Sequence, residues 1–396
     1  MTRHNAAEAV TRPDANGQST RRRRPVRGLA VVAILVLAAL LAVVALPAAR
    51  PGGPAALPGL WSTVTALLGV REPEASATRF LMGTYVSVRA WGPGAAPALD
   101  AVVDRLEEMD RVLGPDDAGS DVRRTALGAG SPVVVSPDML TVLELADRIV
   151  ELSGGAFDPA VGALVALWGF GPDGAAPAGG ETDPGPREPP DQPAVERALA
   201  LTGWHLVDWD RETLTVTLGR EGTSLALGGI AKGYAVDEAA RLLRAAGVTR
   251  AVIDAGGDLY LLGAKPDGHP WRIAVRHPRR DGHLGVLTLG ADTAVATSGD
   301  YENYFEAGGE RYHHILDPAT GRPATGCISV TVVAPTAAVA DALATAVFVL
   351  GPADGLALVE LLADVEALVV DREGDIHLTS GMELLFHPAG GESGDG

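Results

Sequence analysis

The chain has 396 residues, a formal net charge of −18 and 47% hydrophobic residues. That much apolar material is enough for a substantial core, so most of the chain is expected to be globular. The acidic balance argues against a nucleic-acid partner, which needs a basic surface, but it permits a nucleotide ligand whose phosphates meet a metal and backbone amides.

The N-terminus is typical of a membrane anchor. Residues 1–27 form a polar tail that ends in arginines, and residues 28–49 form an apolar run without charge. About 20 apolar residues cross a membrane as a helix, and flanking arginines stay in the cytoplasm. A single-pass anchor is predicted, with the later residues outside the cytoplasm. A cleaved signal peptide is the alternative, but its apolar region typically spans only about 7–15 residues.

The remaining chain is expected to form one domain. Residues 50–77, rich in Pro, Ala and Gly, predict a linker, residues 78–387 the folded domain, and residues 388–396 a disordered tail. The only cysteine is Cys327, so no intrachain disulfide is possible.

Within this domain, hydrophobic periodicity predicts alternating strands and helices. A strand at 85–88 precedes helices over 98–113 and 139–152, and residues 171–194 predict a solvated insertion loop. Further strands are expected over 213–218, 224–227, 251–254, 259–263, 271–275, 286–289 and 329–333, with helices over 232–246 and 337–350. Strands that arrive in runs, with helices between the runs, indicate an α+β fold with mainly antiparallel sheets.

Two glycine-containing segments are candidates for ligand binding. Ser153–Pro159 ends a helix with two glycines and then places Phe157 beside Asp158; a simple helix stop followed by a turn is the alternative. Gly228–Tyr234 joins a strand to a helix that carries Lys232 in its first turn. Glycines permit close backbone approach, and a helix N-terminus with a lysine suits phosphate. A tight turn with a surface lysine is the alternative there.

Two later segments carry polar groups. Thr297–Glu302 and His313–Gly321 place a histidine near carboxylates, a usual general-base arrangement, although such histidines also occur as half-buried strand residues. Asp341 and Thr345 lie four residues apart on an otherwise apolar helix and therefore face the same way. Carboxylate and hydroxyl oxygens suit Mg²⁺ better than zinc. The alternative is that Asp341 caps the helix and Thr345 bonds back to a carbonyl.

In this order, the segments resemble the ApbE family of FAD:protein FMN transferases over residues 80–350. The resemblance is carried by seven motifs: Met82–Thr84, Gly155–Pro159, Gly228–Asp237, Ala255–Asp258, Ser298–Glu302, His314–Gly321 and Ala340–Ala346. Because seven motifs occur in register, the resemblance is far more specific than any single one.

The resemblance implies an extracytoplasmic enzyme with a fold related to the T-fold, which uses Mg²⁺ and transfers FMN from FAD to a Thr or Ser of a flavoprotein, releasing AMP. FAD hydrolysis and non-catalytic flavin binding are alternatives. Matching positions imply the site residues: Met82, Ala156, Phe157, Asp158, Lys232 and the Ile315–Leu316 backbone for FAD; Gly229, Asp341 and Thr345 for Mg²⁺; His314 as base, with Asp317 orienting it.

The sequence departs from the family pattern at three places on the FAD side. Ala226 stands where the family usually has Asp. Residues 114–120 lack the aromatic that usually packs near the flavin, and Ala126 replaces a frequent Asn.

Overall fold

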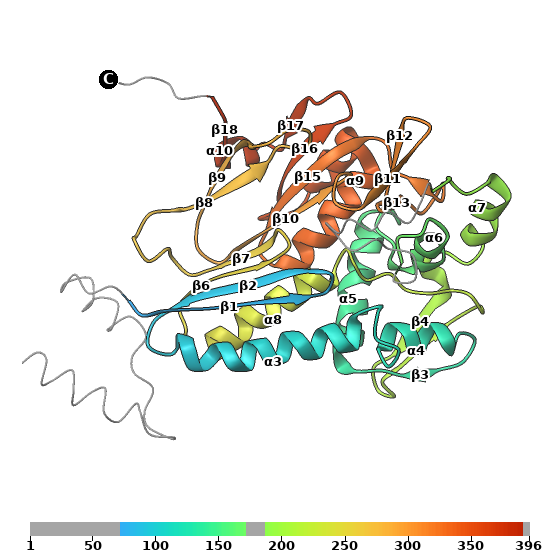
Figure 1. Cartoon of the computed structure of the whole chain (residues 1–396), viewed down its shortest axis with the longest axis horizontal. Coiled ribbons are helices and arrows are strands. Elements are labelled where there is room, and N and C mark those ends of the chain that lie inside the picture. Colours follow the sequence, from blue (N-terminus) through green and yellow to red (C-terminus); the bar gives the residue numbers. More distant parts are fainter. Residues whose placement is uncertain (1–71, 172–186, 391–396) are drawn as a thin grey trace, which may run out of the picture. The chain divides into compact units, whose positions relative to one another are not determined.

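The computed structural model describes residues 72–171 and 187–390 (Figure 1). The predicted basic tail (1–27), the transmembrane run (28–49) and most of the linker lie outside the described residues. Strand β1 (Glu74–Leu81) begins before the start expected at residue 78, because it pairs along its whole length with β2 (Thr84–Trp91). The last linker residues therefore belong to the domain.

An eight-stranded sheet forms the centre of the domain, in the order β1-β2-β6-β7-β10-β15-β16-β17. Every neighbouring pair in it is antiparallel, which confirms the predicted α+β fold with mainly antiparallel sheets. The further strands are β6 (Arg250–Ala255), β7 (Asp258–Leu262), β10 (Thr293–Gly299), β15 (Cys327–Ala334), β16 (Glu366–Asp371) and β17 (Ile376–Leu378).

Helices cover one face of this sheet and enclose the main core (Figure 1). They are α3 (Ala95–Leu113), α5 (Pro137–Leu152), α8 (Ala231–Ala245) and α9 (Ala337–Val359). In α3, Val102, Leu106 and Met109 recur at helical spacing and are buried. Helix α9 is long and apolar enough to cross a membrane, but half of its most apolar window is buried inside the protein. It is the central core helix.

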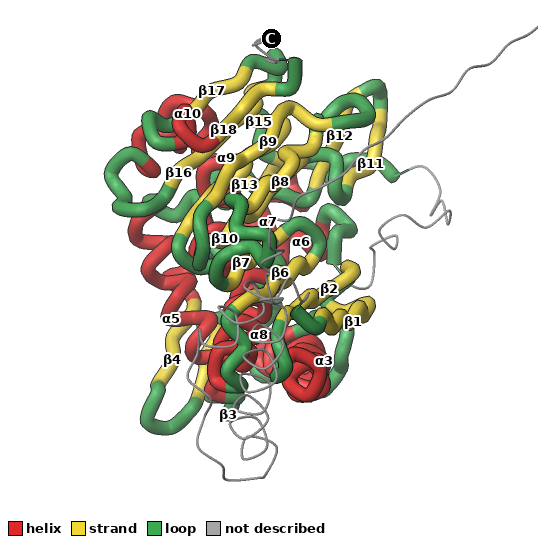
Figure 2. The backbone as a smooth tube through the Cα atoms, turned by 90° about the vertical axis from the view of Figure 1, so that its left-hand side faces the viewer, coloured by secondary structure: helices red, strands yellow, loops and turns green. Residues whose placement is uncertain are grey.

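A second, smaller sheet packs on the other face (Figure 2). Its order is β18-β9-β8, formed by β8 (Trp271–Arg276), β9 (His283–Leu289) and β18 (Phe386–Pro388), with α10 (Met382–Leu385) beside it. Pro388 pairs with Gly285, so the tail predicted from residue 388 starts inside a strand; residues 391–396 lie outside the described part of the chain.

Short elements complete the domain. They are α4 (Asp121–Leu127), α6 (Gly162–Leu167), α7 (Gln192–Leu199), η1 (Pro159–Val161), η2 (Trp204–Leu206), β3 (Val133–Val134), β4 (Val207–Asp210), β5 (Thr215–Leu218), β11 (Tyr304–Ala307), β12 (Glu310–His313), β13 (Leu316–Asp317) and β14 (Arg322–Pro323). Helix α7 starts within the insertion loop predicted for 171–194. Its cap is Asp191, whose carboxylate accepts a hydrogen bond from Ala194 N at 2.8 Å.

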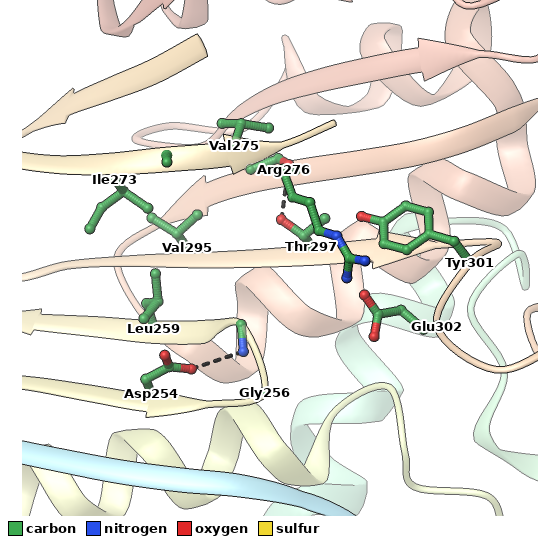
Figure 3. A pocket seen from close by; sticks show the side chains of 13 residues that line it. Asp254, Gly256, Leu259, Ile273, Val275, Arg276, Val295, Thr297, Tyr301 and Glu302 are labelled. Atoms are coloured by element: carbon green, nitrogen blue, oxygen red, sulfur yellow. Dashed lines mark hydrogen bonds between the residues drawn. The ribbon is translucent and has the colours of Figure 1, made fainter. Parts of the chain in front are cut away.

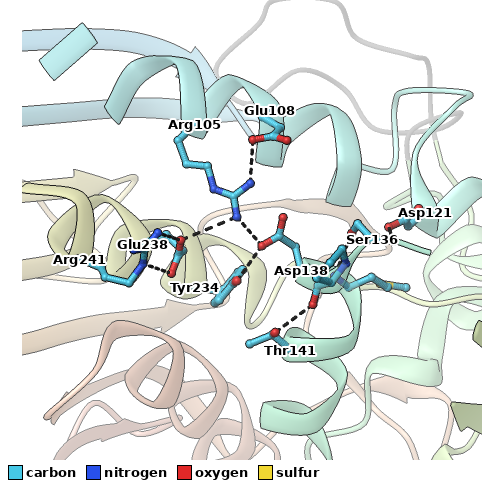
Figure 4. Close-up of polar contacts among 11 residues, drawn as sticks. Arg105, Glu108, Asp121, Ser136, Asp138, Thr141, Tyr234, Glu238 and Arg241 are labelled. Carbon is cyan, nitrogen blue, oxygen red and sulfur yellow. Dashed lines mark hydrogen bonds and ion pairs between the residues drawn. The ribbon is translucent and has the colours of Figure 1, made fainter. Parts of the chain in front are cut away.

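A polar network ties the helical layer together (Figure 4). Arg105 of α3 donates to Asp138 of α5 at 2.5 Å and to Glu108 at 2.8 Å. The hydroxyl of Tyr234 on α8 donates to the same Asp138 at 2.8 Å, and burial raises the pKa of Tyr234. Because α8 also carries Lys232, this network fixes the helix that positions the candidate site.

Candidate functional site

The turn between β1 and β2 fixes Met82. Met82 and Gly83 both have positive φ, 52° and 72°, which is typical of a two-residue hairpin turn whose twist matches the strands. Asp110 of α3 accepts a hydrogen bond from Met82 N at 2.8 Å. The side chain of Met82 packs against the main core, so the turn is held at a defined place on the helical side of the sheet.

The loop after α5 brings an aromatic ring to the site. Phe157 is buried, and its backbone N donates to Ser153 Oγ at 3.1 Å. Asp158 accepts from Ala160 N and from Trp204 N, both at 2.8 Å, so both carboxylate oxygens hold backbone amides. Burial raises the pKa of Asp158. Asp158 therefore shapes the loop that presents Phe157 and the half-buried Ala156.

Lys232, in the first turn of α8, is shared by three oxygen acceptors. Its Nζ lies 2.8 Å from Gly228 O, 3.0 Å from Asp258 Oδ2 and 3.3 Å from Asp341 Oδ2. Asp341 also accepts from Gly233 N at 3.2 Å. The carboxylates come from β7 and α9, so three separate elements meet at this ammonium group.

The charges at this point are buried and unequal. The side chains of Asp258 and Asp341 are only 4% and 6% exposed, and they share the single positive charge of Lys232. Burial raises the pKa of both carboxyl groups; their mutual repulsion adds to this at Asp258, and Lys232 opposes it. The two carboxylates raise the pKa of Lys232 against the effect of burial. Two carboxyl groups thus share one ammonium group, and a second negative charge is costly here because solvent screens it little.

Further oxygens lie next to this cluster. A Cβ placed on Gly229 would sit 2.9 Å from Thr345 Oγ1 and 3.4 Å from Phe157 Cε2, so the α9 hydroxyl and the aromatic ring both lie close to the glycine turn. Ser298 Oγ of β10 lies 3.4 Å from Thr345 Oγ1. The sequence-predicted residues Gly229, Lys232, Asp341, Thr345 and Phe157 are therefore brought together.

This set fits a hard divalent cation. Its donors are oxygens, namely the Asp341 carboxylate, the Thr345 hydroxyl and the backbone at Gly229, and its surplus negative charge is one that a cation relieves. The part of the chain that the structure describes contains no group of three or more His, Cys, Asp and Glu side chains suited to a metal. The expected Mg²⁺ ligands include a hydroxyl and a backbone carbonyl, which do not belong to such a group. The Mg²⁺ site therefore stays a prediction.

The two adjacent histidines have different hydrogen-bond partners. His313 is buried; its Nε2 lies 2.8 Å from Ala324 O, and its Nδ1 accepts from Ile315 N at 3.3 Å, so both ring nitrogens are used. His314 Nδ1 lies 3.2 Å from Asn303 O. Because a carbonyl accepts only, Nδ1 must carry the proton, which leaves the Nε2 lone pair available. Burial lowers the pKa of His314 to about 4, and the charges of His313 and Lys232 add to this.

The polar groups of the residues that follow His314 form hydrogen bonds with nearby residues. Asp317 accepts from Ala319 N at 2.8 Å and from Thr320 Oγ1 at 2.9 Å. Its carboxylate thus closes its own turn, and the group that meets the His314 ring is the Asn303 carbonyl rather than the predicted Asp317. The backbone N of Ile315 donates to His313, and its carbonyl accepts from Ala324 N at 3.0 Å.

Two further residues border the site. Asp258 was placed in a motif from the sequence but was given no role, and it is a direct partner of Lys232. No periodicity or spacing in the sequence predicts that contact. At the departure Ala226, the backbone N donates to Pro159 O at 2.7 Å, so this position lies against the loop that carries Asp158. A carboxylate at residue 226 is absent from that wall of the site.

Comparisons with known proteins point to one family. The model of the ApbE family matches residues 82–369. A Treponema pallidum (strain Nichols) protein named FAD:protein FMN transferase is 36% identical over 332 residues, covering 79% of this chain and 88% of that protein. The crystal structure of the ApbE protein of Thermotoga maritima matches with a TM-score of 0.71 and 34% identity, over 80% of this chain and 100% of that one. The apo Pseudomonas stutzeri flavinyl transferase ApbE matches with a TM-score of 0.69 and 34% identity, over 81% of this chain and 98% of that one.

Proposed function

Since this chain belongs to the ApbE family, we propose that it is an Mg²⁺-dependent FAD:protein FMN transferase that acts on a Thr or Ser hydroxyl of an acceptor flavoprotein. The acceptor oxygen attacks the phosphorus of the FMN half of FAD. A new phosphoester bond forms, the bridging bond to the other phosphate breaks, and AMP leaves with its electron pair. The enzyme class, flavin transfer, follows from the relatives; the cation, the acceptor hydroxyl and the AMP product belong to the proposal.

The observation that carries the proposal is the sharing of Lys232 between two buried carboxylates beside Thr345. Transfer between phosphates requires neutralisation of their charge and in-line alignment. A bound Mg²⁺ would supply Lewis-acid charge neutralisation at Asp341, Thr345 and the Gly229 carbonyl. Lys232, in the first turn of α8, would contribute its ammonium group, which suits a phosphate.

His314 is the candidate general base. With Nδ1 donating to Asn303 O, the free Nε2 lone pair is the atom that would take the hydroxyl proton. A lowered pKa keeps the imidazole neutral at physiological pH, so the base is in its active form before the acceptor arrives.

The proposed location is the outer face of the cell membrane. It rests on the apolar run 28–49 and the arginines before it, all outside the described residues. On this basis the acceptor would be an extracytoplasmic flavoprotein, and the flavin donor would be taken from the same side. The proposed FAD contacts are Met82, Ala156, Phe157, Asp158, Lys232 and the Ile315–Leu316 backbone.

The proposal is tested with the full-length chain in detergent, incubated with FAD, Mg²⁺ and membrane proteins of the producing cells. We expect a fluorescent, covalently bound flavin on a protein band, mapped by mass spectrometry to a Thr or Ser as an FMN phosphoester, with AMP in equal amount. Free FMN and AMP without a labelled protein would instead identify an FAD pyrophosphatase. FAD binding without AMP at any time would identify a non-catalytic flavin-binding protein.

A further inference from the structure

A cavity of about 350 Å³ lies between the central sheet and the smaller sheet (Figure 3). Its floor is apolar, and its rim carries charged and aromatic side chains. The lining residues that matter here are Leu259, Ile273, Val275, Arg276, Tyr301 and Glu302. A volume of this size is typical of a ligand site.

The cavity and the Lys232 cluster lie at the same end of the central sheet, on its opposite faces. Successive side chains of a strand point to opposite faces, and in β10 Thr297 lines the cavity while Ser298 contacts Thr345. The Gly256–Gly257 turn lines the cavity and leads directly into Asp258, the partner of Lys232. Along this glycine turn, the cavity lining and the Lys232 cluster are one residue apart, at Gly257 and Asp258.

One wall of the cavity is the edge of a sheet. Among the described residues β8 pairs only with β9, so its other edge carries backbone groups without a strand partner. Four successive β8 residues, Ile273 to Arg276, line the cavity. Residues of both side-chain orientations contribute, as expected where a strand presents its edge. An exposed strand edge is a template for an added extended segment.

None of the residues assigned to FAD or the cation lines this cavity. The proposed reaction has a second substrate, the acceptor polypeptide, whose hydroxyl must reach the same centre. We propose that the acceptor segment carrying the target Thr or Ser binds in this cavity as an extended strand along β8. This inference rests on the proposed function and names the site of its second substrate.

The rim supplies the polar recognition. The guanidinium of Arg276 packs over the Tyr301 ring at 5.1 Å from its centroid, and its charged end lies beside Glu302 (Figure 3). The turn that carries Tyr301 is held by Asp300, which accepts from both terminal nitrogens of Arg279 at 2.7 and 2.5 Å. The rim is therefore a fixed arrangement of an arginine, an aromatic ring and a carboxylate above an apolar floor.

The test compares two charge reversals on β8. Arg276→Glu changes the cavity rim, and Arg272→Glu changes an exposed arginine of the same strand that does not line the cavity. The acceptor probe is a synthetic peptide spanning the Thr or Ser that the wild-type enzyme labels. We expect Arg276→Glu to raise KM for this peptide by roughly tenfold or more, the equivalent of one lost polar contact. FAD affinity in Mg²⁺ should stay at the wild-type value, and the melting temperature of each variant is measured to confirm that it is folded at the assay temperature.

Equal KM values for the peptide in the wild type, Arg276→Glu and Arg272→Glu would overturn the acceptor site while leaving flavin transfer intact. A parallel rise in both variants would show a general charge effect and would overturn it as well. If the wild-type enzyme labels no protein, the proposed function itself fails, and the acceptor site fails with it.

Discussion

At the residue scale, the site depends on how the charge of Lys232 is balanced. Sequence reasoning identified Lys232 and Asp341 from their motifs, because a lysine in a first helical turn and a carboxylate on an apolar helix are both unusual. It gave no role to Asp258, because the contact between the start of β7 and the start of α8 arises from tertiary packing. It also assigned Asp317 to orient His314, whereas the Asp317 carboxylate closes its own turn.

The charge balance predicts unequal losses of stability for two substitutions. Lys232→Met leaves two buried carboxylates without their shared ammonium and should lower the free energy of unfolding by about 3–5 kcal/mol. Asp258→Asn leaves a matched Lys232–Asp341 pair and should change that energy much less. Denaturant unfolding of both variants at pH 7 measures this. A loss in Asp258→Asn as large as that in Lys232→Met would refute the view that negative charge is in excess.

His314 predicts a loss of chemistry rather than of binding. His314→Asn should lower kcat by roughly 10²–10⁴-fold, the usual contribution of a general base, with FAD affinity unchanged. Because burial lowers the pKa of His314 to about 4, protonation of the base should begin only well below pH 6.5. The wild-type rate should therefore show no decline with a pKa near 6.5 as pH falls. An equal loss of FAD binding and kcat in the variant would make His314 a binding residue.

At the element scale, long amphipathic helices and alternating strands were predictable, and buried or very short segments were not. Helices α3, α5 and α8 lie within a few residues of their predicted ranges, since their apolar positions recur at helical spacing. Strand β10 was missed: it is central, and its small residues Ala, Thr, Ser and Gly show no alternation. The strand predicted over 224–227 is wrong, because Ala226 N bonds to Pro159 O and Ser224 O accepts from Gly162 N, which ties the segment to a loop.

The crossing of α8 and α9 positions both carboxylate and lysine, and it predicts sensitivity at Gly233. A Cβ on Gly233 would lie 2.3 Å from Ala337 O, so the two helices approach too closely for any side chain there. Gly233→Ala should destabilise the fold by about 1–3 kcal/mol through overpacking. Gly228→Ala is the control, since a Cβ there meets nothing within 4 Å. Thermal unfolding that is equal in both variants would contradict the close crossing.

At the scale of the whole molecule, the fold collects short motifs at one end of a sheet. The glycine turn before α8, the start of β7, the end of β10 and the first turns of α9 are far apart in sequence and meet around Lys232 and Thr345. The order of motifs let the sequence identify the family and most of this site. It could not identify the cavity behind β10, because that space is created by the packing of one sheet on another.

The central claim is that Thr345 and Asp341 bind a divalent cation that in turn binds the FAD pyrophosphate. The most direct measurement is FAD affinity of the full-length chain by titration calorimetry, with Mg²⁺ and with EDTA, for the wild type and Thr345→Val. We predict that Mg²⁺ tightens FAD binding by the wild type roughly tenfold or more and that most of this gain is lost in Thr345→Val, which keeps the shape and removes the oxygen. The same FAD affinity with Mg²⁺ and with EDTA in the wild-type chain would contradict the claim.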